Sequence, residues 1–118
     1  MAGLPPKEPE KRDEISGTFL SLVTISFLEL RQDLARLVET GWSEPVRRRA
    51  QELASTLEEA CGRQGMTDLS RIARSVASLT RLSFKEAGPI ILALRQKFDE
   101  LLTLGQREIA RHSKRQTG

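Results

Sequence analysis

Cysteine and histidine are almost absent from this chain of 118 residues, which has one of each. A single cysteine, Cys61, excludes an internal disulfide, and we expect it to be a small core residue. Metal sites built from cysteine and histidine are likewise excluded, so we predict no metal and no cofactor. The only histidine, His112, lies in a basic stretch near the C-terminus, where we expect a solvated tail residue.

Tyrosine and long apolar runs are missing too. Because β-branched residues are scattered and no segment alternates strictly between apolar and polar, we predict no strand. The longest apolar-rich stretch, residues 19–30, contains polar side chains and is too short to span a bilayer. No N-terminal segment has the pattern of a secretory signal. We therefore expect a cytoplasmic protein with no membrane insertion.

Neither sign of charge dominates, since 19 Lys and Arg face 16 Asp and Glu, a formal net charge of +3. Nucleic-acid binding needs a concentrated basic face, with aromatic side chains for base stacking, and the sequence favours neither. The run Arg47-Arg48-Arg49 forms either a charged outer helix face or a docking patch for an acidic partner surface. Triad-like spacings and glycine-rich phosphate loops are absent as well, so we predict no enzymatic activity.

Four segments have apolar residues at helical spacing. Three of the five prolines lie before residue 10, so we expect residues 1–12 to be a flexible lead-in, residues 13–113 to be the folded domain and residues 114–118 to be a flexible tail. The four apolar stripes are Leu20, Val23, Phe27, Leu30, Leu34 and Leu37; Val46, Ala50, Leu53, Leu57 and Ala60; Leu69, Ile72, Val76 and Leu79; and Ile91, Leu94, Phe98, Leu101 and Ile109.

Turn and capping residues separate these segments. Gly41 ends the first helix, Ser43 is a candidate N-cap for the second, and residues 62–65 break it. Ser83 and Glu86 form a capping box for the fourth helix, whereas Pro89 requires that helix either to begin near Gly88 or to kink there. Short connections place neighbouring helices antiparallel, so the fold class is all-α, an up-down-up-down four-helix bundle.

The first helix has a partial second apolar face. Leu22, Ile25 and Leu28 project away from the main stripe at 100° per residue. Either the N-terminal lead-in or the long fourth helix covers them, or they form a dimer or partner interface.

The second and third helices resemble the signature of histidine-containing phosphotransfer (HPt) domains. That signature reads Ala-His-x-Leu-Lys-Gly, five residues, then Gly-small-x-x-Leu. Ala54, Leu57, Gly65 and Leu69 fall in the matching places. Further matches lie in residues 27–34, in the tight turn Thr40-Gly41-Trp42, in residues 46–50, and at Ile72, Ala73 and Val76. The resemblance covers roughly residues 15–105 and implies the same four-helix bundle.

In that family the histidine accepts a phosphoryl group, a lysine offsets its charge, and a glycine leaves room for a receiver domain. This sequence has Ser55, Glu58 and Glu59 in those places. A serine phosphate ester has a much lower transfer potential than a phosphohistidine, and the glutamates repel phosphate. The resemblance therefore implies a degenerate phosphorylation site.

Two functional hypotheses follow. The first is a non-catalytic HPt-like signalling module that binds a receiver domain or a histidine-kinase component in a two-component or phosphorelay pathway without carrying phosphate. The second is a helical homo-oligomeric assembly or adaptor module that dimerises through the first helix and is unrelated to phosphorelay. The candidate partner-binding residues of the first hypothesis are Arg48, Gln51, Glu52, Ser55, Glu58, Glu59 and Gly62.

Overall fold

The computed structural model describes residues 16–117, which form helices and short connections without a strand in that range. The long helices are α2 (Gly17–Glu39), α3 (Glu44–Arg63), α4 (Thr67–Leu79) and α6 (Ile91–Thr117); a short helix α5 (Phe84–Ala87) and a 3₁₀ turn η1 (Gly88–Ile90) precede α6. The predicted all-α four-helix bundle is confirmed. Among these helices none is long and apolar enough to cross a membrane.

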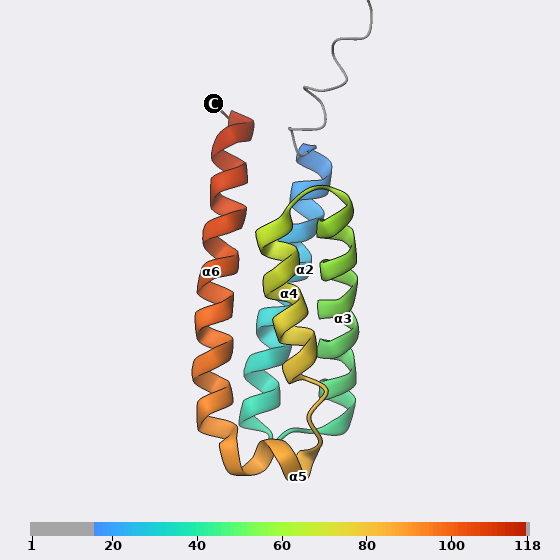
Figure 1. Cartoon of the computed structure of the whole chain (residues 1–118), viewed down its shortest axis with the longest axis vertical. Helices are drawn as coiled ribbons and strands as arrows, with labels where there is room; N and C mark the ends of the chain where they lie inside the picture. The colour runs from blue at the N-terminus through green and yellow to red at the C-terminus, as the bar shows by residue number, and fades with distance from the viewer. Residues whose placement is uncertain (1–15, 118) are drawn as a thin grey trace, which may run out of the picture.

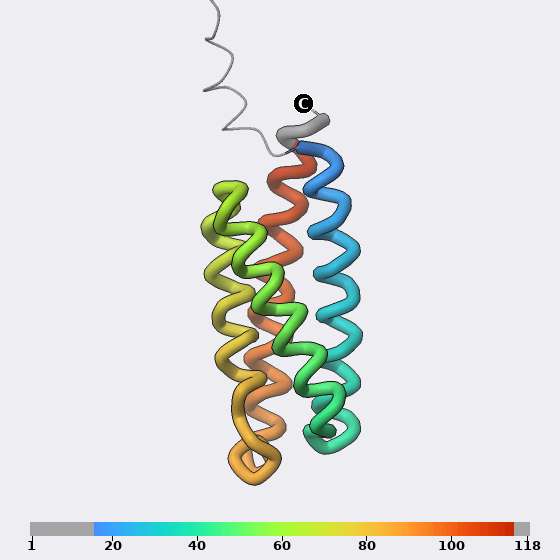
Figure 2. Tube along the Cα trace, turned by 90° about the vertical axis from the view of Figure 1, so that its right-hand side faces the viewer, coloured from blue at the N-terminus to red at the C-terminus, as the bar shows by residue number. Residues whose placement is uncertain are grey.

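Each long helix packs against its neighbours in the bundle: α2 lies against α3 and α6, and α4 lies against the same two helices. In Figure 1 the α2–α3 connection and α5 lie at one end of the bundle, and the α3–α4 connection lies at the other. Consecutive long helices therefore run in opposite directions in this view. Figure 2 shows that α3 lies beside α2 near their connection and leans away from the N-terminal half of α2.

The two predicted flexible ends of the chain differ in how much of them the structure describes. The lead-in predicted for residues 1–12 lies outside it. At the other end, α6 continues to Thr117, and the flexibility predicted for residues 114–118 stays a prediction.

The α2–α3 and α3–α4 turns use the same helix-ending motif. Gly41 and Gly65 have φ of 82° and 83°, a left-handed conformation that glycine adopts without steric cost. The next residue donates its backbone N–H back to the helix, from Trp42 to Leu37 O and from Met66 to Cys61 O, each at 2.9 Å. This is the Schellman pattern. In both turns that next residue is buried, so the motif closes the helix and adds a side chain to the core.

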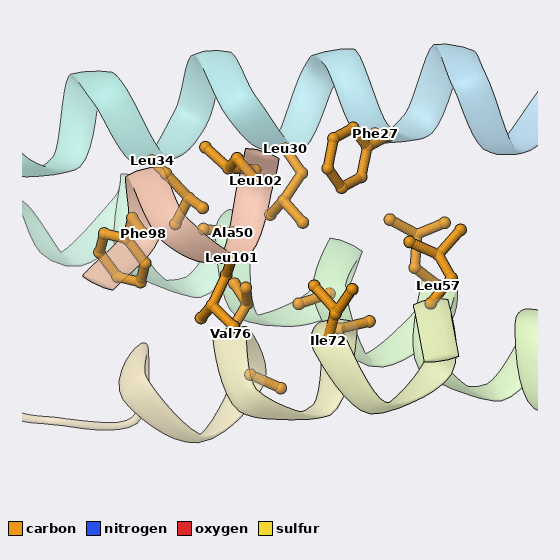
Figure 3. Packing of buried hydrophobic residues seen from close by; sticks show 14 of the residues in the cluster. Phe27, Leu30, Leu34, Ala50, Leu57, Ile72, Val76, Phe98, Leu101 and Leu102 are labelled. Carbon is orange, nitrogen blue, oxygen red and sulfur yellow. The ribbon is translucent and has the colours of Figure 1, made fainter. Parts of the chain in front are cut away.

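The core of the bundle is formed mainly by the predicted stripes (Figure 3). All six predicted residues of α2 are buried. The α3 stripe is shifted slightly, because Ala54 and Cys61 are buried whereas Val46, Leu53 and Ala60 are half-buried. Cys61 is thus the core residue that we predicted, and its burial raises the pKa of its thiol to about 11.

The segment around Pro89 agrees with the first expected alternative, because a 3₁₀ turn starts at Gly88 and the long helix α6 begins directly after it. Ser83 and Glu86 do form a capping box, with Ser83 N–H donating to Glu86 Oε1 at 2.8 Å and Glu86 N–H donating to Ser83 Oγ at 3.2 Å. The box caps only the short helix α5. Pro89 lies in the 3₁₀ turn, where the missing N–H costs little, and α6 begins at Ile91, directly after this turn.

Trp42 connects three elements at the α5 end of the bundle. Its indole Nε1–H donates to the backbone carbonyl of Leu82 at 2.7 Å, in the connection between α4 and α5. Its ring stacks on Phe98 of α6, with centroids 6.3 Å apart and an interplanar angle of 9°. Trp42 itself has φ of 73°, a conformation that is unfavourable for a bulky residue.

We expect Trp42→Phe to lower the free energy of unfolding by about 1–3 kcal/mol, because the ring is kept while the partly buried Leu82 carbonyl loses its donor. Trp42→Leu should cost more, since it also removes the stacked ring. Chemical denaturation followed by circular dichroism measures both. Equal stabilities of wild type and Trp42→Phe would show that the hydrogen bond does not matter.

Gly105 of α6 is buried where α6 meets α2. A Cβ at this position would lie 2.5 Å from Phe27 Cζ and 3.4 Å from Leu69 Cδ1. The ring of Phe27 is itself buried, so it has little room to move. Glycine therefore permits the close approach of α6 to α2 at this level.

We expect Gly105→Ala to destabilise the bundle by about 1–3 kcal/mol through overpacking, despite the higher helix propensity of alanine. Gly62→Ala is the matched control, because the nearest atom there is Ser70 Oγ at 3.3 Å and the position is exposed. The control should stay within about 1 kcal/mol of wild type. Thermal and urea unfolding of the two variants test the comparison.

Candidate functional site

Five of the seven predicted partner-binding residues lie exposed along one face of α3. They are spaced 4-3-4-3 along the helix and are called the α3 strip here: Arg48, Glu52, Ser55, Glu59 and Gly62. This spacing keeps side chains on one helix face. Because α6 packs against α2 and α4, the strip belongs to the side of the bundle away from α6.

Glu58 does not belong to the exposed strip. Its carboxylate accepts a hydrogen bond from Arg74 Nε of α4 at 2.8 Å, and its side chain is 27% exposed. The Ser70 hydroxyl also donates to the Glu58 backbone carbonyl at 2.8 Å. Glu58 thus joins α3 to α4, and an arginine balances its charge.

Gln51 is half-buried as well, because it belongs to a network around Arg47. Arg47 Nη1 donates to Gln51 Oε1 at 3.2 Å and to the backbone carbonyl of Thr80 at 2.8 Å. Its Nε and Nη2 donate to the two carboxylate oxygens of Glu44 at 2.9 and 2.6 Å. Since Thr80 is the C-cap of α4, Arg47 ties the start of α3 to the end of α4.

The three consecutive arginines therefore have different surroundings, although from the sequence we interpreted them as one basic patch. The side chain of Arg47 is only 14% exposed. Arg49 pairs with the buried Asp33 of α2 at 3.1 Å. Arg48, whose side chain is 74% exposed, lies 3.2 Å from Glu44 and contributes its cation to the strip. The ion pair of Arg49 with Asp33 had one signal in the sequence, because Asp33 is an acidic residue that lies between the core residues Leu30 and Leu34.

A hollow of about 660 Å³ lies over the first half of the strip. Its lining residues are all polar: Arg47, Arg48, Gln51, Glu52, Ser55 and Thr56. A second cleft, of about 500 Å³, lies between α2 and α3 and shares Glu52 and Thr56 with the hollow. A polar lining with both signs of charge suits contact with a polar protein surface better than burial of an apolar small molecule.

Groups for nucleophilic or metal chemistry do not come together in the described part of the chain. No set of three or more His, Cys, Asp or Glu residues there could hold a metal ion. The Cys61 thiol is buried, and its raised pKa keeps it protonated near neutral pH. His112 is half-buried on α6, which differs from the solvated tail position that we expected. Ser55 is exposed, but neither a histidine nor a cysteine belongs to the α3 strip.

No protein-family model, curated protein or solved structure matches this chain. The resemblance to HPt domains therefore depends on the motif residues.

The ion pairs of Glu44 make a pH-dependent contribution to stability. Hydrogen bonds from Arg47, helped by Arg48, lower the pKa of the Glu44 carboxyl from 4.5 to about 2. A pKa lowered by folding stabilises the folded state above the unfolded pKa, and this contribution is lost as the pH falls toward the folded pKa. The loss should therefore occur between pH 4.5 and 2.

We expect Glu44→Gln to be less stable than wild type at pH 7 and the difference to shrink as the pH falls through that range. Added salt should also reduce it, because Glu44 is exposed. Urea midpoints measured at several pH values test this, with Glu39→Gln, an exposed carboxylate at the end of α2, as the control. A difference that is independent of pH would contradict the role of the carboxylate charge.

Proposed function

We propose that this chain is a non-catalytic, HPt-like signalling module that binds a partner protein through the α3 strip without carrying phosphate. The partner is a receiver domain or a histidine-kinase component of a two-component or phosphorelay-type pathway. The observation that carries the proposal is the exposure of Ser55 on the outer face of α3, beside the polar hollow. The motif resemblance places the phosphorylated histidine of HPt domains at this position.

The chemistry at Ser55 argues against phosphotransfer. A serine ester would hold phosphate too stably for return to a receiver aspartate. Glu59 and Glu52 add exposed negative charge on the same strip, which disfavours a phosphoryl group. Glu58 contributes less to this repulsion than the sequence implies, because Arg74 balances its charge.

The same features suit protein docking. The strip offers one exposed cation, Arg48, and two exposed carboxylates, Glu52 and Glu59, so a partner with complementary charges can be selected and oriented. Ser55 has a small side chain and Gly62 has none, so a partner surface can approach the helix backbone closely at the middle and at the end of the strip. Neighbouring side chains that bind α4, such as Arg47 and Glu58, hold the strip's helix in place. Competition for a receiver surface, or scaffolding of a receiver and a kinase, would then need no group transfer.

The first test is phosphotransfer itself. When the chain is incubated with a radiolabelled phospho-receiver, we expect it to stay unlabelled, because the strip has no histidine. Acid-labile label on the chain would contradict the proposal, and its position, at His112 or elsewhere, would identify the acceptor.

The second test is docking. A panel of receiver domains and histidine-kinase fragments from the source organism is measured against the chain by calorimetry, and at least one should bind. Ser55→Arg should weaken that binding about tenfold or more, a cost of about 1.4 kcal/mol, by placing bulk in the middle of the strip. Thr103→Arg is the matched control, because Thr103 is exposed on α6. Binding to no member of the panel, or equal effects of the two variants, would contradict docking on the α3 strip.

A further inference from the structure

The N-terminal half of α2 presents apolar side chains to solvent. Leu22, Ile25 and Leu28 are 58%, 55% and 46% exposed. They lie roughly opposite the buried stripe of the same helix, as 100° per residue requires. Single exposed apolar residues are ordinary on a protein surface, but several on one helix face make that face a candidate interaction site.

The bundle leaves this face open. Of the two explanations that would cover it, the long helix α6 does not, since the three side chains are exposed with α6 in place. The lead-in, residues 1–12, lies outside the described residues. On the other flank, α3 leans away from this half of α2 (Figure 2).

Charge is also missing from this part of the helix. Residues 16–28 contain no Asp, Glu, Lys or Arg, whereas charged residues make up 30% of the chain. A surface without charge has no means of selecting a charged partner. It can, however, meet an identical copy of itself without bringing like charges together.

The spacing of the three residues has the symmetry of such a contact. Leu22 and Leu28 lie three residues before and after Ile25. In an antiparallel pair of α2 helices centred on Ile25, the Ile25 side chains meet, and Leu22 of each copy lies level with Leu28 of the other. A two-fold interface needs this self-complementarity.

We propose that the outer face of α2 around Ile25 is a homodimer interface, in which two copies of the chain pair α2 antiparallel about a two-fold axis. Just outside the apolar centre, the same pairing brings Ser21 level with Glu29 of the second copy and Thr18 level with Gln32. These are polar pairs without like-charge repulsion. The interface goes beyond the proposed docking function and does not depend on it, because the α3 strip lies on another helix.

The patch is small. Standard-size stable interfaces bury about 800 Å² on each partner, and three half-exposed side chains with their polar neighbours belong to the smaller and weaker class. We therefore expect a dimer that dissociates on dilution.

The mass of the full chain in solution tests the dimer. Sedimentation equilibrium over a range of concentrations should show a mass that rises toward twice the 13.2 kDa of one chain. Ile25→Asp should abolish the rise and leave the circular dichroism unchanged, because the site is exposed. Ala35→Asp is the matched control, since Ala35 is exposed on the same helix beyond the paired region, and it should dimerise like wild type. A single-chain mass at concentrations up to about 1 mM, where a dimer with a Kd as weak as about 1 mM would still be populated, overturns the proposal, as do equal masses for wild type and Ile25→Asp.

Cross-linking tests the orientation. The native Cys61 is buried, so wild type should form no disulfide-linked dimer under mild oxidation. Ile25→Cys should cross-link readily, because the two-fold axis passes through this position. Ala35→Cys should not, since its two copies would lie about 30 Å apart along antiparallel helices at 1.5 Å per residue. Cross-linking of Ala35→Cys, or failure of Ile25→Cys to cross-link, overturns the antiparallel arrangement.

Discussion

The hydrogen bond and ring contact of Trp42 are the constraint on which one end of this bundle depends. Two connections and one helix meet there: the α2–α3 turn that contains Trp42, the α4–α5 connection that provides the Leu82 carbonyl, and helix α6, which provides Phe98. A backbone φ of 73° is costly for tryptophan, and it is sustained because the indole gains a buried stacking partner and a satisfied N–H. Arg47 acts beside it, since its hydrogen bond to Thr80 O fixes the end of α4 just before the Leu82 connection. Two side chains from one short stretch of sequence thus connect all four helices at this end.

The sequence predicts this fold well where a helix packs through one regular stripe. The prediction of buried residues in α2 is correct at every position of its stripe, because leucines and other large apolar residues at 3-4 spacing define a single buried face. The α3 helix was harder, since its buried residues are small. Ala54 and Cys61 are fully buried while Leu53 and Ala60 are half-buried, and hydrophobicity alone does not rank alanine above leucine. Pro89 was ambiguous for a different reason, because a capping box before it and an apolar stripe after it allowed more than one helix start.

In the candidate site, too, helical spacing predicts which residues share a face, whereas contacts with other helices could not be predicted from the sequence. Helical spacing alone predicts that Arg48, Glu52, Ser55, Glu59 and Gly62 share an exposed face, and they do. Glu58 and Gln51 could not be separated from them in this way, because the arginine that binds Glu58 comes from another helix and the one that binds Gln51 is itself anchored to the end of α4. Likewise, the three adjacent arginines read as one basic patch until Asp33 and Thr80 give two of them specific partners. Charge runs in a sequence therefore overestimate the charge available for docking.

The two surfaces proposed here differ in physical kind, and that difference decides how they can work together. The α3 strip is polar and carries both signs of charge, so it can select and orient a partner, but exposed ion pairs contribute little binding energy each. The α2 face is apolar and uncharged, so it contributes association without selectivity and suits a copy of itself. A two-fold dimer built on α2 would present two α3 strips in a fixed relation. Once one subunit of a dimeric partner has bound one α3 strip, its other subunit would meet the second α3 strip at a high effective concentration. This gain compensates for the weakness of each polar contact.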